Sequence, residues 1–148
     1  PVDESKGFGF FRDFIDEHPE LKPYRTEWRI FDASYHIAGT IDLIVKHGAG
    51  FDMYDWKRSK KIIEPLTGDP ITQDQWNNTG IGKFSDVDDT SFNHYALQQN
   101  IYRYILEENY GLEISNMYLV VMHPTHDKYY KTKVPFLKNR VKLMLNAL

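Results

Sequence analysis

Two aspartates and one lysine lie in a hairpin-like stretch, residues 37–57, at a spacing that suggests chemistry. Asp42 falls inside a first predicted strand that is rich in β-branched residues, and Asp55 and Lys57 lie at the end of a second, apolar one. The residues between the segments, 47–50, include two glycines and can fold the chain back. Residues two apart in a strand share a face, so Asp55 and Lys57 point the same way and Asp42 can join them. Two carboxylates and an ammonium group in this arrangement suit a divalent cation and an activated water.

The same three residues also have an ordinary structural interpretation. The pattern acidic-x-Lys occurs three times in the chain, so the triplet alone proves little. Only the triplet 55–57 ends an apolar strand and has an aspartate in the strand before it. Under the alternative, Asp42 and Asp55 are solvated residues on a one-sided sheet, and Lys57 is their ion-pair partner.

Size and composition narrow the class of protein. A chain of 148 residues is expected to form one domain, 1–148, with its own core. The net charge of −3 argues against a basic nucleic-acid coat, although a local basic patch can coexist with it. The chain has no cysteine, which excludes disulfides and cysteine-held zinc or iron–sulfur centres.

The predicted cellular location of the protein depends on the absence of membrane-spanning and signal segments from this sequence. No run approaches the ~20 apolar residues of a membrane span, and no signal peptide is visible. We therefore expect an intracellular protein of the cytoplasm, the nucleus or a viral replication site, not a secreted or membrane protein. The chain begins at Pro1 instead of Met, so we expect a domain taken from a longer protein.

Hydrophobic periodicity predicts an α/β (α+β) domain with a mixed sheet flanked by helices. Helices are expected over three ranges: 1–19, 91–110 and 136–148. Strands are expected over five ranges: 27–36, 37–45, 51–56, 115–123 and 129–134. The first three form an antiparallel meander, and the fourth, which follows a helix, crosses over to lie parallel to one of them.

The best-defined helix is the one predicted over residues 91–110. A Thr-Ser pair can cap its start, and Gly111 ends it. Helical spacing places one stripe towards the core: Leu97, Ile101, Tyr104 and Ile105. Three polar side chains are expected to face solvent: Gln99, Arg103 and Glu107. Gln98 and Tyr102 lie four apart at the border, where a side chain can reach an active site.

The segment 62–91 has no strong periodicity, and a loop of this length is usually functional or mobile. We expect one short helix within it, over residues 72–76. Its aromatic residues Trp76 and Phe84 are expected to pack the loop down, with stacking on nucleic-acid bases as the alternative.

Taken in order, these features resemble the PD-(D/E)XK nuclease superfamily, and within it the RecB-like exonuclease branch. The stretch Gly39-Thr40-Ile41-Asp42 is similar to the branch's G-x-x-D strand, and Asp55-Trp56-Lys57 to its (D/E)-x-K strand. The helix that follows carries Gln98 and Tyr102 as in its Q-x-x-x-Y motif, and the resemblance covers residues 27–122. It implies a restriction-endonuclease-like core and a metal-dependent deoxyribonuclease. Such an enzyme hydrolyses phosphodiester bonds, as an exonuclease on DNA ends or single strands in replication, recombination or repair.

The resemblance also implies roles for individual residues. Asp42 and Asp55 would bind Mg²⁺ or Mn²⁺, with the backbone carbonyl of Trp56 as a third ligand. Glu27 matches an upstream acidic position and is either a further ligand or a surface carboxylate. Lys57 would orient or help deprotonate the attacking water and offset the charge of the scissile phosphate.

Contacts with nucleic acid are predicted on both sides of this site. Gln98 and Tyr102 resemble residues that brace the site and contact the nucleic-acid backbone. Arg58, Lys60 and Lys61 follow the lysine of the motif and can hold phosphates, or they are a solvated strand exit or a localisation signal. Beyond DNA, relatives are often fused to a helicase, a polymerase or another replication or repair module, which the parent protein is expected to share.

Four histidines and two alternative functions are also considered as hypotheses. His123 and His126 are expected to be ordinary loop residues, and His94 and His18 are weaker candidates for substrate contact. One alternative function is a nuclease-derived module that binds nucleic acid or a protein without cutting. Another is a cap-snatching RNA endonuclease, which shares the metal-binding core. The Q-x-x-x-Y motif of the helix argues against this alternative.

Overall fold

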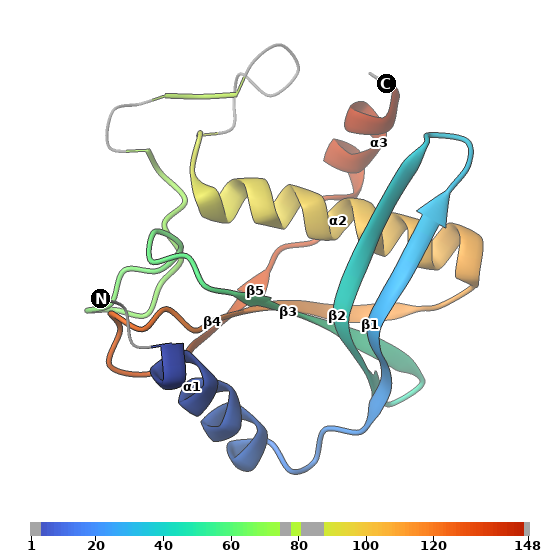
Figure 1. Cartoon of the computed structure of the whole chain (residues 1–148). Helices are drawn as coiled ribbons and strands as arrows, with labels where there is room; N and C mark the ends of the chain where they lie inside the picture. Colours follow the sequence, from blue (N-terminus) through green and yellow to red (C-terminus); the bar gives the residue numbers. More distant parts are fainter. Residues whose placement is uncertain (1–3, 75–77, 81–87, 147–148) are drawn as a thin grey trace.

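A five-stranded mixed sheet, in the order β1-β2-β3-β4-β5, lies at the centre of the computed structural model, which describes residues 4–74, 78–80 and 88–146 (Figure 1). Its strands are β1 (Pro23–Asp32), β2 (Ile37–His47), β3 (Gly50–Lys57), β4 (Ile114–Val121) and β5 (Tyr130–Val134). The helices are α1 (Glu4–Glu17), α2 (Ser91–Tyr110) and α3 (Lys138–Asn146). None of the described helices has the length and the apolar character that crossing a membrane requires.

The predicted topology is confirmed. Strands β1, β2 and β3 form the antiparallel meander, with a hairpin between β2 and β3 that closes at His47 and Gly50. Strand β4 lies parallel to β3 after the crossover through α2, and β5 pairs antiparallel with β4 at the edge. The chain is therefore α+β, with a mixed sheet between helices.

The predicted first strand, 27–36, is wrong at both ends, because β1 begins at Pro23 and ends at Asp32. Most of β1 is exposed, so its first residues carry no hydrophobic signal. At its end, the Asp32 side chain accepts a hydrogen bond from the Tyr35 backbone N–H at 2.9 Å and closes a turn. Residues 72–74 of the predicted short helix are not helical, and the remainder lies outside the described residues, as do Trp76 and Phe84.

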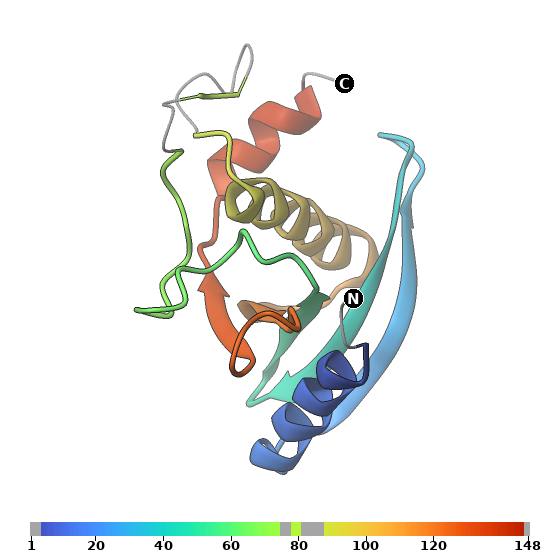
Figure 2. The same cartoon turned by 60° about the vertical axis from the view of Figure 1, so that its left-hand side comes forward.

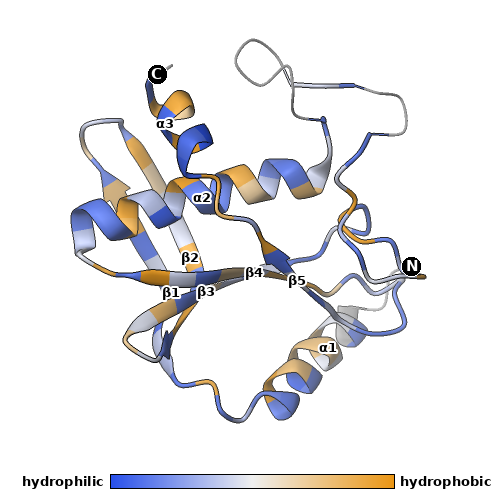
Figure 3. Cartoon of the chain, turned by 180° about the vertical axis from the view of Figure 1, so that it is seen from behind, coloured by the Kyte–Doolittle hydropathy of each residue, from blue (hydrophilic) through white to orange (hydrophobic). Residues whose placement is uncertain are grey.

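Each face of the sheet carries its own hydrophobic core. Figures 1 and 2 show α1 on one face and α2 with α3 on the other. The core under α2 includes Phe92, Ala96, Ile105, Leu106, Ile41, Ile44, Met53 and Leu119. The core under α1 includes Phe10, Phe14, Leu43, Val45, Tyr54 and Val120. Figure 3 shows hydrophilic and hydrophobic residues alternating along the helices, as expected when one side of each helix covers the sheet.

Helix α2 has the predicted bounds and the predicted core stripe, but its polar side differs from the predicted one. The Thr90 side chain caps its start, and Gly111 ends it in the left-handed conformation. Gln99 and Arg103, which we expected in solvent, are buried. The Gln99 amide donates to the Tyr118 carbonyl at 3.1 Å. The reason is that α2 is covered by the sheet and by the segment that leads into α3, so its polar side chains bond to backbone there.

Arg103 shows how a charged group is accommodated inside this helix. Its guanidinium donates to the Ile114 carbonyl at 2.6 Å and to the Glu107 carboxylate at 3.0 Å. It also lies 3.5 Å from the ring centroid of Phe136, on the chain before α3. The buried charge is therefore paired and ties the helix to β4 and to the chain before α3.

Candidate active site

The candidate site lies where β2 and β3 separate. The last residue pair of their ladder is Leu43 with Tyr54, and the next residues along the two strands are Asp42 and Asp55. Beyond this point β3 continues to pair only with β4. The backbone N–H of Trp56 donates instead to the Asp42 carboxylate, at 2.8 Å. Asp42 therefore occupies the opening between the strands and is held there by backbone.

Asp42 and Asp55 form a carboxyl pair at this opening. The Asp42 carboxyl lies within hydrogen-bonding reach of the Asp55 carboxyl, and Lys57 Nζ lies 2.9 Å from the Asp55 carboxylate. The side chain of Asp55 is only 17% exposed. Burial, followed by the contact with Asp42, raises the pKa of Asp55 to about 7, while Lys57 acts in the opposite direction. Asp55 therefore keeps its proton up to near neutral pH, and a bound cation would favour its charged form.

Helix α2 fixes Lys57 from the other side. The ammonium group lies 4.2 Å from the ring centroid of Tyr95, so it is held between this ring and Asp55. The Trp56 side chain points to the opposite face and packs edge-on against Phe11 of α1, with 5.5 Å between ring centroids. Tyr95 was not predicted as a site residue, although it lies one helical turn before Gln98, on the same side of the helix.

Gln98 and Tyr102 contact each other and the start of β2. The Gln98 amide donates to the Tyr102 hydroxyl at 3.2 Å. The Tyr102 ring lies on Gly39, where an added Cβ would come within 2.3 Å of the ring carbon Cζ. The glycine of the G-x-x-D stretch and the tyrosine of the Q-x-x-x-Y stretch therefore meet, and only a residue without a side chain fits under the ring.

Glu27 lies level with Asp42 on the neighbouring strand. Its neighbours Thr26 and Trp28 pair with Leu43 and Ile41, which flank Asp42. Its backbone has φ of +46°, a left-handed conformation that is uncommon for a non-glycine residue. The three predicted acidic ligands thus occupy one row across three strands.

A kink in β2 coincides with this strained residue. Ile41 belongs to the core under α2, whereas Leu43 belongs to the core under α1. Residues two apart in a regular strand would share a face, so β2 turns over at Asp42. The turnover brings Asp42 to a cavity of about 720 Å³ on the α1 side, which Glu27 and His18 also line.

Asp42 and Asp55 are the two carboxylates that the structure brings together, whereas no three histidine, aspartate or glutamate side chains among the described residues form a group that could hold a metal ion. Glu27, level with Asp42 on β1, stays a predicted further ligand. Two carboxylates still suit Mg²⁺, which keeps several waters and is usually bound by one or two carboxylates together with substrate phosphate.

The basic residues after β3 leave the sheet directly beside this pair. Arg58 lies against α1, where its guanidinium is 3.4 Å from the position of a Cβ added at Gly7. Lys60 and Lys61 are exposed on the same segment. The three residues of the predicted phosphate contacts are therefore exposed on the segment that follows Lys57 in the chain.

Three of the four histidines that we considered bond to neighbouring groups. His94 pairs with Asp89, and the His123 ring bonds to the Thr125 hydroxyl at 2.7 Å. His126 is buried, and burial lowers its pKa. The ring of His18 bonds to the Phe14 carbonyl at 2.7 Å, so Nδ1 carries the hydrogen and Nε2 is the acceptor of the neutral ring.

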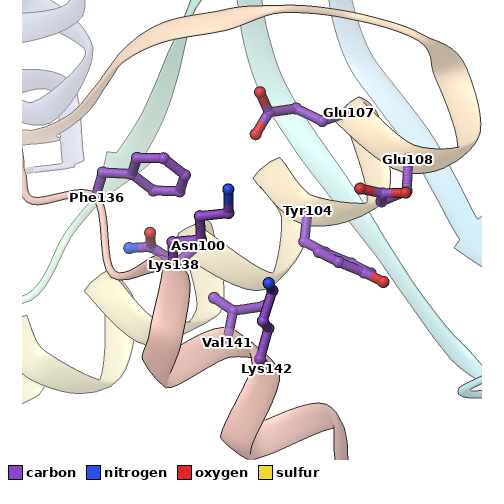
Figure 4. A pocket seen from close by; sticks show the side chains of 8 residues that line it. All are labelled: Asn100, Tyr104, Glu107, Glu108, Phe136, Lys138, Val141 and Lys142. Atoms are coloured by element: carbon purple, nitrogen blue, oxygen red, sulfur yellow. The ribbon is translucent and has the colours of Figure 1, made fainter.

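A separate pocket of about 310 Å³ lies between α2 and α3 and shares no residue with the site (Figure 4). Glu107, Glu108, Lys138 and Lys142 line it with charges of both signs. Asn100, which also lines it, is bound on both ends of its amide by backbone groups. We interpret this pocket as a packing groove.

No protein-family model and no curated protein matches this chain. The chemistry is therefore inferred from the geometry: a mostly buried carboxyl pair at a strand opening, an ammonium group in contact with it, and basic residues beside it. This combination suits metal-assisted attack of water on a phosphate ester.

Proposed function

We propose that this chain is a divalent-metal-dependent deoxyribonuclease of the PD-(D/E)XK superfamily, RecB-like branch, with a restriction-endonuclease-like core. It hydrolyses phosphodiester bonds in DNA, as an exonuclease on ends or single strands. One observation carries the proposal: the carboxyl groups of Asp42 and Asp55 meet where β2 and β3 separate, with the Lys57 ammonium 2.9 Å from Asp55.

The residues present fit Mg²⁺ or Mn²⁺. Hard cations prefer carboxylate and carbonyl oxygens, and the opening offers Asp42, Asp55 and the Trp56 carbonyl. Asp42 uses Oδ2 for the Trp56 N–H and keeps Oδ1 for a ligand. When bound, the cation would supply positive charge beside the phosphate oxygens and acidify a water.

Lys57 and the residues of α2 supply the remaining interactions. In hydrolysis the water oxygen attacks phosphorus, the bond from phosphorus to the leaving oxygen breaks, and the leaving oxygen takes a proton. Lys57, held by Asp55 and the Tyr95 ring, positions the water and offsets the phosphate charge. Because Gln98 donates to Tyr102, the tyrosine hydroxyl keeps its own hydrogen for a phosphate oxygen.

Phosphates of the flanking nucleotides are expected on the exposed segment after β3. Arg58, Lys60 and Lys61 place three exposed positive charges within four residues after Lys57 in a chain whose net charge is −3. Binding should therefore weaken as salt concentration rises, because each phosphate contact releases counterions.

Cleavage of end-labelled DNA with Mn²⁺ and with Mg²⁺ tests the proposal. Asp55→Asn and Lys57→Met are each expected to lower the rate about 100-fold or more. The matched controls are Asp52→Asn, a buried aspartate of β3 outside the site, and Lys46→Met, an exposed lysine of β2. Thermal melting of every variant checks that it is folded. Unchanged cleavage in both site variants would overturn the mechanism.

Two outcomes separate the alternative functions. Divalent-metal binding in calorimetry without cleavage of any nucleic acid would favour the non-cleaving module. Faster cleavage of RNA than of DNA of the same sequence would favour the RNA endonuclease.

A further inference from the structure

The cavity beside Asp42 has walls that are unlike the rest of the site. It measures about 720 Å³ and lies between α1, the segment that follows α1, and the meander. Apolar or aromatic side chains form most of its wall: Phe11, Ile15, Pro19, Leu21, Pro23 and Trp56. Asp42 and Glu27 are its acidic residues, and none of the described residues that line it is a lysine or an arginine.

The charge of this cavity decides what can enter it. The cavity offers a phosphate no lysine or arginine, whereas Lys57 lies on the other side of the opening, so the phosphate belongs with Lys57 and with the metal ion that the carboxyl pair would hold. A neutral, flat group fits better, because it can cover the apolar wall and donate hydrogen bonds to a carboxylate. A nucleobase has both properties, and a ring N–H (as in thymine) or an amino group can donate to Glu27.

The walls also favour an aromatic occupant. Ile15 is 43% exposed although it lines the cavity, so an occupant that covers it removes apolar surface from water. The half-buried Trp56 indole faces the cavity beside Phe11, at a T-shaped angle of 90°. Bases stack on such side chains with little dependence on sequence. A volume of about 720 Å³ is within the range of small-molecule sites and exceeds what one base needs.

We infer that this cavity binds one unpaired nucleobase of the DNA strand that is cut. The inference rests on the proposed nuclease function and specifies its substrate. Asp42 lines the cavity and also contacts Asp55, so the base belongs to a nucleotide at or beside the scissile phosphate. A paired base cannot enter without leaving its duplex, and this cost is least for a single strand or a frayed end. The cavity thus selects single-stranded DNA.

The test replaces bases one at a time. Oligothymidylates that carry one abasic (tetrahydrofuran) nucleotide at successive positions are bound to the protein in Ca²⁺ and measured by fluorescence anisotropy. With the natural chain, loss of the base at one position is expected to weaken binding about 10-fold. In Ile15→Trp, whose indole fills the cavity, the same loss is expected to change binding less than about 2-fold.

Phe8→Trp is the matched control, because Phe8 lies on the same helix, is 61% exposed and does not line the cavity. It should keep the full base dependence. The inference is overturned if no position shows base dependence, or if Ile15→Trp keeps as much of it as the control.

Cleavage assays of the same oligonucleotides in Mn²⁺ separate the two proposals. If the natural chain cuts none of them, the proposed nuclease function fails, and the anisotropy result still decides whether the cavity binds a base. If it cuts all of them equally well, the function stands and the base site does not.

Discussion

Gly39→Ala is the substitution whose effect the structure predicts most directly. An alanine Cβ at this position of β2 would lie 2.3 Å from Cζ and 2.5 Å from the hydroxyl oxygen of Tyr102. Atoms cannot remain that close, so the ring has to move, and its hydrogen bond from Gln98, now 3.2 Å long, would be lost. The substitution therefore separates α2 from β2 beside the candidate site.

The expected magnitude depends on whether the ring is present. Overpacking of this kind costs about 1–3 kcal/mol of unfolding free energy. Without the ring, replacing glycine by alanine inside a strand is favourable by about 0.5–1 kcal/mol. The effect of Gly39→Ala should consequently change sign in a Tyr102→Ala background, and the coupling between the two positions should be about 1.5–4 kcal/mol.

Urea unfolding of four proteins measures this coupling: the natural chain, each single variant and the double variant. Gly9→Ala is the control, because a Cβ there meets no atom within 4 Å and α1 should gain about 0.5–1 kcal/mol. If Gly39→Ala costs the same free energy with and without the Tyr102 ring, the packing explanation is refuted. Cleavage should also fall in Gly39→Ala, because the bond between Gln98 and Tyr102 is lost.

Two further predictions concern buried charges. In the metal-free protein the pKa of Asp55 is raised from 3.8 to about 7, so the folded state holds this proton more tightly than the unfolded state does. The free energy of unfolding should therefore fall by up to about 4 kcal/mol between pH 4 and pH 7. Above pH 7 this contribution is lost and the unfolding free energy should stay level. Chemical unfolding across this pH range in EDTA should show a smaller slope for Asp55→Asn. Arg103→Met should lower the unfolding free energy by about 2–3 kcal/mol, because Glu107 and the Ile114 carbonyl lose a buried hydrogen-bond donor. Thermal melting measures this loss, with Lys133→Met, at an exposed lysine of β5, as the control.

The convergence of Asp42 and Asp55 follows from local rules. A short glycine-containing turn predicts the hairpin, its register sets Asp42 level with Asp55, and the structure places the two aspartates in contact. The ends of α2 follow equally well from its capping residues. In each case the deciding interactions lie within a few residues along the chain or across one turn.

Tertiary contacts decide the features that the sequence did not predict. Gln99 and Arg103 look like solvent-facing residues of a helix, and only the packing of α2 against β4 lets them form buried bonds to its backbone. The contact of Lys57 with Tyr95 joins residues from a strand and a helix that a long loop separates. The cavity is likewise made by α1, β1 and β3 together, so no single segment carries a signal for it.

The left-handed backbone of Glu27 raises the question of whether its carboxylate or its conformation matters, and three substitutions distinguish these roles. Glu27→Gly removes the carboxylate but suits a φ of +46°, so it should raise the unfolding free energy by about 1 kcal/mol. Glu27→Gln keeps the backbone cost and removes only the charge, whereas Glu27→Val opposes the kink and should destabilise by about 1–3 kcal/mol. Because Glu27 lies level with Asp42 and lines the same cavity, we expect cleavage to fall in both the glycine and the glutamine variants. Full cleavage by the more stable glycine variant would show that this position contributes only the bend that opens the sheet.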